Sequence, residues 1–198
     1  FFNSFMKVGI VGYGFVGKAL KNGIDNSVSV LNIDPKLNTS IKDLIPFQPN
    51  IIFICVPTPL CEDLSLDASI VHSVIDEILD HNIDSLIVLK STILPNHLEK
   101  ISLKVKRFIY NPEFLREKHA TEDFLNSNLI VFGGEQKNIN EIKDFYIEQT
   151  KCICKSYVET DLVTASLIKY TINSYLATKV SFFNELKKIF IRANANDS

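Results

Sequence analysis

The segment G-Y-G-F-V-G at residues 12–17 places the strongest constraint on how this chain folds. It follows an apolar, β-branched run at residues 7–11 and opens a helix-patterned stretch at residues 15–24. Glycines at this spacing allow a tight turn, a close approach of a ligand to the backbone, and close packing of the helix on the strand. The free N–H groups at the start of that helix can then face a phosphate. The segment therefore predicts a strand–turn–helix unit with a phosphate-binding turn.

An acidic residue further along the chain extends this hypothesis to a dinucleotide. Asp34 ends the next strand-like segment, about 20 residues after the first glycine of the turn. A carboxylate in that place accepts hydrogen bonds from the adenosine ribose hydroxyls and repels a 2′-phosphate. We therefore expect NAD rather than NADP as the cofactor. A glycine turn of purely structural purpose is the alternative interpretation of the motif.

Strand-like and helical segments alternate along the chain. Apolar runs suited to strands recur at residues 51–56, 85–92, 107–112 and 128–134. Residues 67–80 are amphipathic, with helical spacing of Ile70, Val71, Val74, Ile75 and Ile78. Because most strands are continuously apolar, both faces of their sheet must be covered. The predicted fold class is α/β: a Rossmann-like, mostly parallel sheet with helices on both faces, followed by a long α-helix.

The last part of the chain predicts that long helix. No glycine or proline interrupts residues 161–190, which is longer than most helices of globular proteins. Lys169 and Asn173 lie one turn apart on one face, where a solvated pair without a role is the alternative. We expect a Rossmann-like domain over residues 1–158, and the central helix with the start of a next segment over residues 159–198. An apolar stripe follows the helix: Leu162, Ile168, Ile172, Leu176, Val180, Phe183 and Leu186.

Charge and cysteine usage exclude several classes of protein. The net charge of −2 is spread over interspersed signs, and the longest apolar run is too short to span a bilayer. We therefore expect no nucleic-acid partner, no membrane partner and, from the opening FFNSF, no signal peptide. Cys55, Cys61, Cys152 and Cys154 lack the spacing and the histidines of a zinc site. We expect no metal and free thiols in the cytoplasm, with Cys152 and Cys154 on one face of a strand-like segment.

Three polar loops follow predicted strands, at the edge where open α/β sheets bind ligands: VPTP (56–59), STILP (91–95) and NPEFLRE (111–117). Each alone is explained by a proline that ends a strand, but together they bring hydroxyls, acids and an arginine to one rim. With the glycine turn, FGG (132–134) and SLIKYTINSYLATKVSFFNEL (166–186), they resemble the UDP-glucose/GDP-mannose dehydrogenase family. The related 3-hydroxyacid and 6-phosphogluconate dehydrogenases share the helical Lys and Asn but lack VPTP and NPEFLRE.

The resemblance implies an oxidation of a nucleotide sugar, UDP-glucose or similar, by NAD. The C6 alcohol becomes a carboxylate through an aldehyde and a cysteine thioester, in a homodimer joined by the central helix. Glu113 matches the acid that supports the attacking water, Thr92 a hydroxyl that positions water, and Glu117 an acid near the nicotinamide. Lys169 would stabilise oxyanion charge, and Asn173 would hold the water or the developing alkoxide.

The candidate residues form three groups. The catalytic candidates are Thr92, Glu113, Lys169 and Asn173. The substrate-binding candidates are Glu113, Phe114, Leu115, Arg116, Lys169 and Asn173. The cofactor-binding candidates are Gly12, Tyr13, Gly14, Phe15, Val16, Gly17, Asp34, Lys36, Val56, Pro57, Thr58, Thr92 and Glu117.

The sequence also departs from the family pattern. The cysteine nucleophile and the second sugar-nucleotide domain of the family follow the central helix, and none of the four cysteines here takes that position. Asn96 replaces a glycine that permits an unusual backbone angle near Thr92, and Lys118 replaces a small residue. We expect a fragment of an enzyme or a truncated homologue. The alternative functions are a non-catalytic module that binds NAD and part of the nucleotide sugar, and a related 3-hydroxyacid-type dehydrogenase.

Overall fold

The computed structural model describes residues 6–63 and 65–193 of the 198-residue chain. The opening residues 1–5, where we read no signal peptide, lie outside this part. A 7-stranded sheet has the order β2-β1-β3-β4-β5-β6-β7, and every neighbouring pair is parallel except β5 and β6. The predicted mostly parallel sheet is thereby confirmed. Its strands are β1 Lys7–Val11, β2 Ser29–Ile33, β3 Ile51–Ile54, β4 Leu86–Leu89, β5 Phe108–Tyr110, β6 Ile130–Gly134 and β7 Tyr157–Thr160.

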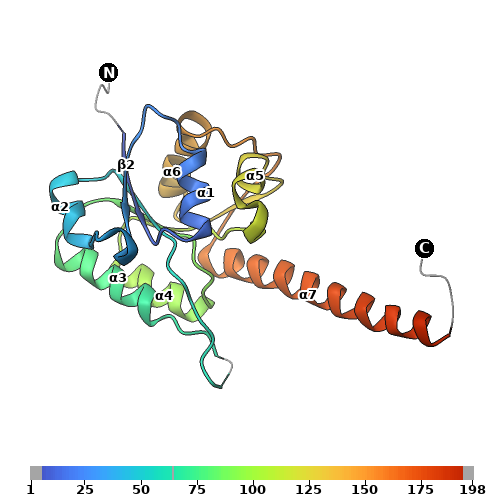
Figure 1. Cartoon of the computed structure of the whole chain (residues 1–198). Helices are drawn as coiled ribbons and strands as arrows, with labels where there is room; N and C mark the ends of the chain where they lie inside the picture. Colours follow the sequence, from blue (N-terminus) through green and yellow to red (C-terminus); the bar gives the residue numbers. More distant parts are fainter. Residues whose placement is uncertain (1–5, 64, 194–198) are drawn as a thin grey trace.

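Helices cover both faces of the sheet, as predicted (Figure 1). One face carries α1 (Phe15–Gly23), α5 (Ala120–Leu125) and α6 (Gln136–Gln149), and the other α2 (Leu44–Phe47), α3 (Ser69–Asp80) and α4 (Pro95–Lys104). Three short 3₁₀ turns are η1 (Pro35–Leu37), η2 (Ile41–Asp43) and η3 (Glu117–His119). Alternate side chains of a strand enter the two cores, so on β3 Ile52 and Ile54 pack on one face while Ile51 and Phe53 pack on the other.

The long helix α7 spans Leu162–Arg192, 31 residues, and its N-cap is Asp161, whose side chain accepts the Thr164 N–H. Its first turns pack tightly on β6, because a Cβ placed on Gly133 would lie 2.6 Å from the Cβ of Ala165. The rest of α7 projects away from the sheet (Figure 1). The apolar stripe therefore divides into a packed beginning and a projecting remainder, where Val180 is 62% exposed.

The amphipathic helix predicted within residues 67–80 is confirmed as α3, with Val71, Ile75 and Ile78 buried and Ile70 38% exposed. One local prediction was wrong. Residues 151–154 are not a strand, because their backbone binds the ends of two helices: the Lys151 N–H donates to Gly23 O and the Ile153 N–H to Leu125 O. The strand β7 begins only at residue 157.

The four cysteines are free in the structure. Cys152 and Cys154 both pack against the core that α1 and α6 cover, so they do face the same side of the chain. Among the described residues, no helix combines the length and the apolar character needed to cross a membrane.

Candidate functional site

The predicted site residues gather at one edge of the sheet. Strands β1 to β5 are mutually parallel, so the loops that follow them emerge at the same edge. The glycine turn, Asp34, VPTP, STILP and NPEFLRE all belong to these loops. The sequence prediction that they share one rim is therefore confirmed by the topology. The beginning of α7 packs beside this rim, against β5, β6 and α4.

The glycine turn has the shape of a phosphate cradle. Gly12 has φ +92°, and a Cβ there would lie 2.7 Å from the Cys55 carbonyl oxygen. A Cβ on Gly17 would lie 2.2 Å from the Gly12 oxygen, so α1 packs directly on the turn. A Cβ on Gly14 would meet no heavy atom within 4 Å, and no side chain caps α1 at this residue. The first and third glycines are thus required by packing, while the second leaves open space at a helix N-terminus that fits a pyrophosphate.

Asp34 is held beside that turn by backbone donors. One carboxylate oxygen accepts the Tyr13 N–H at 2.8 Å, and the other accepts the Lys36 N–H at 2.9 Å. These bonds, with that of Tyr13 the stronger, lower the pKa of Asp34. The carboxylate is therefore oriented and ionised, with lone pairs left for the hydroxyls of a ribose. Within the glycine turn, Phe15 is exposed and Val16 is partly buried.

The VPTP and STILP loops are joined to each other and to α7. The Ser91 hydroxyl donates to Val56 O at 2.7 Å, and the Ser166 hydroxyl of α7 donates to Ile93 O at 2.9 Å. Thr92 lies between these two fixed residues and is half-buried, like Thr58, while Pro57 is exposed. The position of the Thr92 backbone is therefore set from both sides.

Asn96, which stands where the family has glycine, does not distort this region. It lies in the first turn of α4, which begins at Pro95. The positive φ angles of non-glycine residues in the described part of the chain are at Asn38, Gln48 and Asn82. An asparagine fits the helical backbone at position 96 without strain.

Lys169 and Glu113 meet at the start of α7. The Lys169 ammonium donates to the Glu113 carbonyl oxygen and lies 3.3 Å from its Oε1. The other carboxylate oxygen of Glu113 accepts the Leu115 N–H at 2.6 Å, and the ammonium lies 5.1 Å from the centre of the Phe114 ring. Lys169 is only 3% exposed, so a solvated lysine without a partner is excluded. Asn173, one turn further along α7, is exposed.

Arg116, a substrate-binding candidate, forms an ion pair within the chain. Its guanidinium pairs with Asp123 of α5, with Nε to Oδ2 at 3.0 Å and Nη2 to Oδ1 at 2.7 Å. The bond from Arg116 lowers the pKa of Asp123 to about 2. Within this structure Arg116 thus joins the end of the NPEFLRE loop to α5. Glu117 follows in η3 and is exposed.

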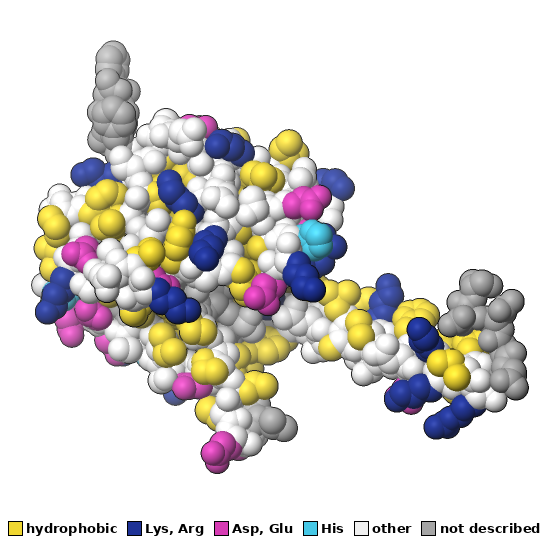
Figure 2. Space-filling model, in the orientation of Figure 1, with side chains coloured by type: hydrophobic (Ala, Val, Ile, Leu, Met, Phe, Trp, Pro, Cys, Tyr) yellow, Lys and Arg dark blue, Asp and Glu magenta, His cyan; other side chains and the backbone are white. Residues whose placement is uncertain are grey.

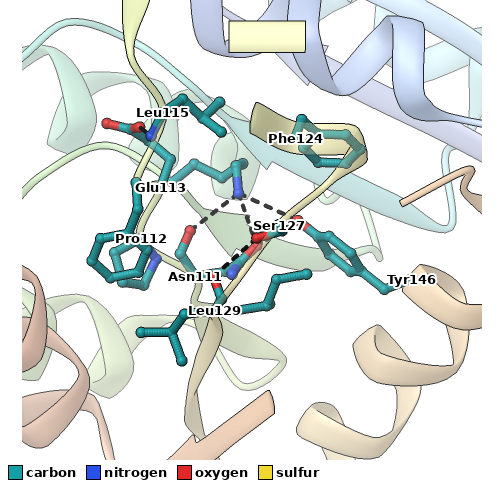
Figure 3. A pocket seen from close by; sticks show the side chains of 11 residues that line it. Asn111, Pro112, Glu113, Leu115, Phe124, Ser127, Leu129 and Tyr146 are labelled. Atoms are coloured by element: carbon teal, nitrogen blue, oxygen red, sulfur yellow. Dashed lines mark hydrogen bonds between the residues drawn. The ribbon is translucent and has the colours of Figure 1, made fainter. Parts of the chain in front are cut away.

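The structure adds a buried polar group that sequence reasoning missed. Lys90 is 3% exposed, and its ammonium lies 2.9 Å from Asn111 Oδ1, which also accepts the Tyr146 hydroxyl at 2.7 Å. Figure 3 shows Asn111 and Tyr146 pointing toward one another in a pocket that Glu113 and Leu115 also line. The pocket has room for about one water molecule. The available signals were a lysine ending an apolar strand and an asparagine directly before a proline.

Comparison with known proteins agrees with this geometry. Residues 36–150 match the model of the NAD binding domain of the UDP-glucose/GDP-mannose dehydrogenase family. The UDP-glucose 6-dehydrogenase of Rickettsia felis is 43% identical over 153 residues, which cover 73% of this chain and 34% of that protein. The UDP-glucose 6-dehydrogenase YwqF of Bacillus subtilis is 32% identical over 163 residues, which cover 75% of this chain and 36% of that protein. This chain thus spans about a third of the length of the curated relatives it matches.

Solved structures show the same fold. The GDP-mannose dehydrogenase of Pseudomonas aeruginosa, in a ternary complex, superposes with a TM-score of 0.77 at 22% identity. The match covers 96% of this chain and 54% of that one. At this identity the likeness establishes the architecture of the sheet and its helices.

Proposed function

Since the chain belongs to the UDP-glucose/GDP-mannose dehydrogenase family, we propose that it forms the NAD-binding part and one active-site wall of a nucleotide-sugar 6-dehydrogenase. Its cofactor is NAD, as the matched domain of the family binds NAD. The observation that carries the proposed activity is the buried contact between Lys169 and Glu113, placed at the same rim as the glycine turn. A structural fold alone does not require a buried cation beside a carboxylate at a ligand-binding edge.

The residues of the rim fit NAD in the expected order. We propose that residues 12–17 and the start of α1 hold the pyrophosphate, and that Asp34 binds the adenosine ribose. Lys36, Thr92 and Glu117 complete the proposed set, together with the loop at residues 56–58. NAD, when bound, supplies the acceptor for a hydride.

On the substrate side, Lys169 and Glu113 have different proposed roles. Their mutual contact holds both groups in fixed orientations within a largely buried site, where electrostatic effects are strong. We propose that the Lys169 ammonium stabilises negative charge on a substrate oxygen and that the Glu113 carboxylate orients water. Asn173 and Thr92 would hold that water or the substrate oxygen, and Phe114, Leu115 and Arg116 would bind the sugar nucleotide. UDP-glucose is the first substrate to test, because it appears in the name of the Rickettsia felis relative.

The cysteines of this chain are poor candidates for the nucleophile of the aldehyde step. Burial raises the pKa of Cys55 to about 12 and that of Cys152 to about 11, and a thiolate is the reactive form. Burial also raises the pKa of Cys154. Cys61 is exposed in the loop after VPTP, and like the other three it does not take the position after the central helix that the family pattern gives to the nucleophile. We therefore propose that a thiolate from outside these 198 residues completes the oxidation to a carboxylate.

We also propose that the protein is a homodimer through α7. Figure 2 shows apolar and basic side chains mixed along the projecting part of this helix. Leu176, Val180 and Phe183 are more than half exposed there, which is an unfavourable state for large apolar side chains. A second copy of the helix is an occupant with a matching apolar surface.

Calorimetry with the NAD-loaded chain tests the proposed function. UDP-glucose should bind to the wild type, and Lys169→Met should abolish that binding while the affinity for NAD stays unchanged. Lys179→Met, an exposed lysine on the same helix, is the matched control. NADH formation is then followed with UDP-glucose, UDP-N-acetylhexosamines and GDP-mannose. Equal binding of UDP-glucose by wild type and Lys169→Met would reject the site, and NAD binding without any nucleotide-sugar binding would favour a cofactor-binding module alone.

A further inference from the structure

A second buried lysine, Lys90, holds the other end of the segment that carries Glu113. It follows β4 directly, and its ammonium contacts three oxygens: Asn111 Oδ1 at 2.9 Å, Asn111 O at 3.3 Å and the Tyr146 hydroxyl at 3.3 Å. Lys169 of α7 donates a hydrogen bond to the Glu113 carbonyl oxygen. Two lysines that are each 3% exposed therefore fix the segment 111–115 from two sides.

Asn111 is the point at which several elements converge. Its backbone N–H donates to Leu89 O at 2.8 Å, and its side-chain amide donates to Val131 O at 2.9 Å. Its side-chain oxygen accepts from both Lys90 and Tyr146 (Figure 3). One residue thus connects β4, β6 and α6, and its hydrogen-bonding groups are satisfied in the buried site.

The step from Asn111 to Glu113 is short and stiff. Pro112 lies between them and is buried, its ring fixes its own φ angle, and it restricts the preceding Asn111 to extended conformations. An orientation imposed on Asn111 is therefore transmitted to Glu113 with little freedom. A loop without a proline at position 112 would transmit the orientation of Asn111 to Glu113 less strictly.

Stability alone does not explain a lysine at position 90. The partners of its ammonium are neutral oxygens, so burying this charge costs more than burying an apolar side chain of similar length. Burial accordingly lowers the pKa of Lys90. A methionine would fill the same space without that cost, but it would remove the donor to the Asn111 carbonyl oxygen and leave the amide oxygen with the Tyr146 hydroxyl alone.

We propose that Lys90 is a positioning residue: by fixing Asn111, it sets the orientation in which Glu113 meets Lys169 and the substrate. The inference rests on the proposed role of Glu113 and Lys169 in binding the sugar nucleotide. Lys90 itself acts from behind the segment, through Asn111 and Pro112. Its loss should therefore change substrate binding and leave the glycine turn unaffected.

The test compares Lys90→Met with Lys106→Met, which removes an exposed lysine just before β5. The first readout is hydrogen exchange at the Leu115 amide, which donates to Glu113 and reports its orientation. Exchange there should become about tenfold faster in Lys90→Met, as expected for the loss of a hydrogen bond to a charged group. Amides of β1 and α1 should keep their wild-type rates, and Lys106→Met should match the wild type throughout.

The second readout is a pair of affinities measured by calorimetry. Lys90→Met should lower the affinity for UDP-glucose by about tenfold and change the affinity for NAD by less than about twofold. Lys90→Arg retains a cationic donor and should restore the slow exchange of the Leu115 amide. An equal loss of both affinities, or faster exchange over the whole domain, would show a merely structural role and overturn the inference.

Two further outcomes also bear on the inference. If Lys90→Met does not fold, Lys90→Gln replaces it, because its uncharged amide ends one atom short of the Lys90 ammonium and weakens the bonds to Asn111; faster exchange at Leu115 then supports the inference and an unchanged rate overturns it. If the wild type binds no nucleotide sugar, the proposed function fails. The exchange at Leu115 still decides whether Lys90 fixes the segment.

Discussion

Lys169 and Glu113 are 56 residues apart in the chain, yet the ammonium of one contacts both the backbone carbonyl and the carboxylate of the other. The contact joins the first turns of α7 to the loop after β5. It places a nearly inaccessible cation at the rim that also carries the glycine turn. The pair connects the packing of the long helix with the chemistry proposed for the rim.

Breaking this pair should cost stability. Lys169→Met leaves the Glu113 carboxylate, 15% exposed, without its cation, so the free energy of unfolding should fall by about 2–3 kcal/mol. Urea denaturation measures the change, with the exposed Lys179→Met as control. Glu113→Gln keeps the backbone carbonyl that accepts from Lys169, so its free energy of unfolding should fall by less than that of Lys169→Met. A loss below that of the control would contradict the assignment of a buried pair.

The glycine turn offers a matched pair of substitutions. Gly12→Ala forces a Cβ into the Cys55 carbonyl at a positive φ angle, so it should destabilise the fold by about 2–3 kcal/mol. Gly14→Ala meets open space and should unfold like the wild type, but its methyl group should lower the affinity for NAD at least several-fold. Thermal unfolding and calorimetry separate the two effects. Full NAD affinity in Gly14→Ala would place the pyrophosphate elsewhere.

Asp34 should decide between the two nicotinamide cofactors. The wild type should prefer NAD over NADP, because the ionised carboxylate would meet the extra phosphate of NADP. Asp34→Ala should lower the affinity for NAD by about tenfold and remove most of the preference for NAD over NADP. Titration of both cofactors into both proteins is the measurement, with the exposed Asp63→Ala as control. An unchanged ratio of affinities in Asp34→Ala would refute this role.

The ion pair of Arg116 and Asp123 should appear in the acid unfolding of the chain. The folded pKa of Asp123 is about 2 and its ordinary value is 3.8, so the pair stabilises the fold at higher pH. That contribution should be lost as the pH falls from 3.8 to about 2. Solvent screening reduces its size, because Arg116 is largely exposed. Arg116→Ala should therefore flatten the acid dependence of the melting temperature in this window, and an identical slope in both proteins would contradict it.

The projecting part of α7 should mediate self-association. Leu176→Glu with Phe183→Glu places charges on its exposed apolar side and should convert a dimer into a monomer. Light scattering after gel filtration gives the mass, and Lys179→Glu, also on the projecting part, controls for a change of charge. A wild-type chain that stays monomeric at every concentration tested would exclude α7 as the dimer surface.

Local patterns in the sequence determined much of this molecule. Strands and helices alternate visibly because apolar runs and 3.6-residue spacing are properties of neighbouring residues. The glycine turn and Asp34 were also predictable, since both lie at ends of strands whose parallel order follows from the alternation. The long helix α7 followed from the absence of glycine and proline.

The tertiary structure alone decided the contacts between distant residues. Nothing local shows that Lys169 is buried against Glu113, that Arg116 turns to Asp123, or that Lys90 meets Asn111. The segment 151–154 alternates like a strand, but the ends of α1 and α5 provided better hydrogen-bond partners for its backbone. Period and composition describe which side of an element is apolar. Which polar groups then meet depends on how the elements pack, and that is a property of the whole chain.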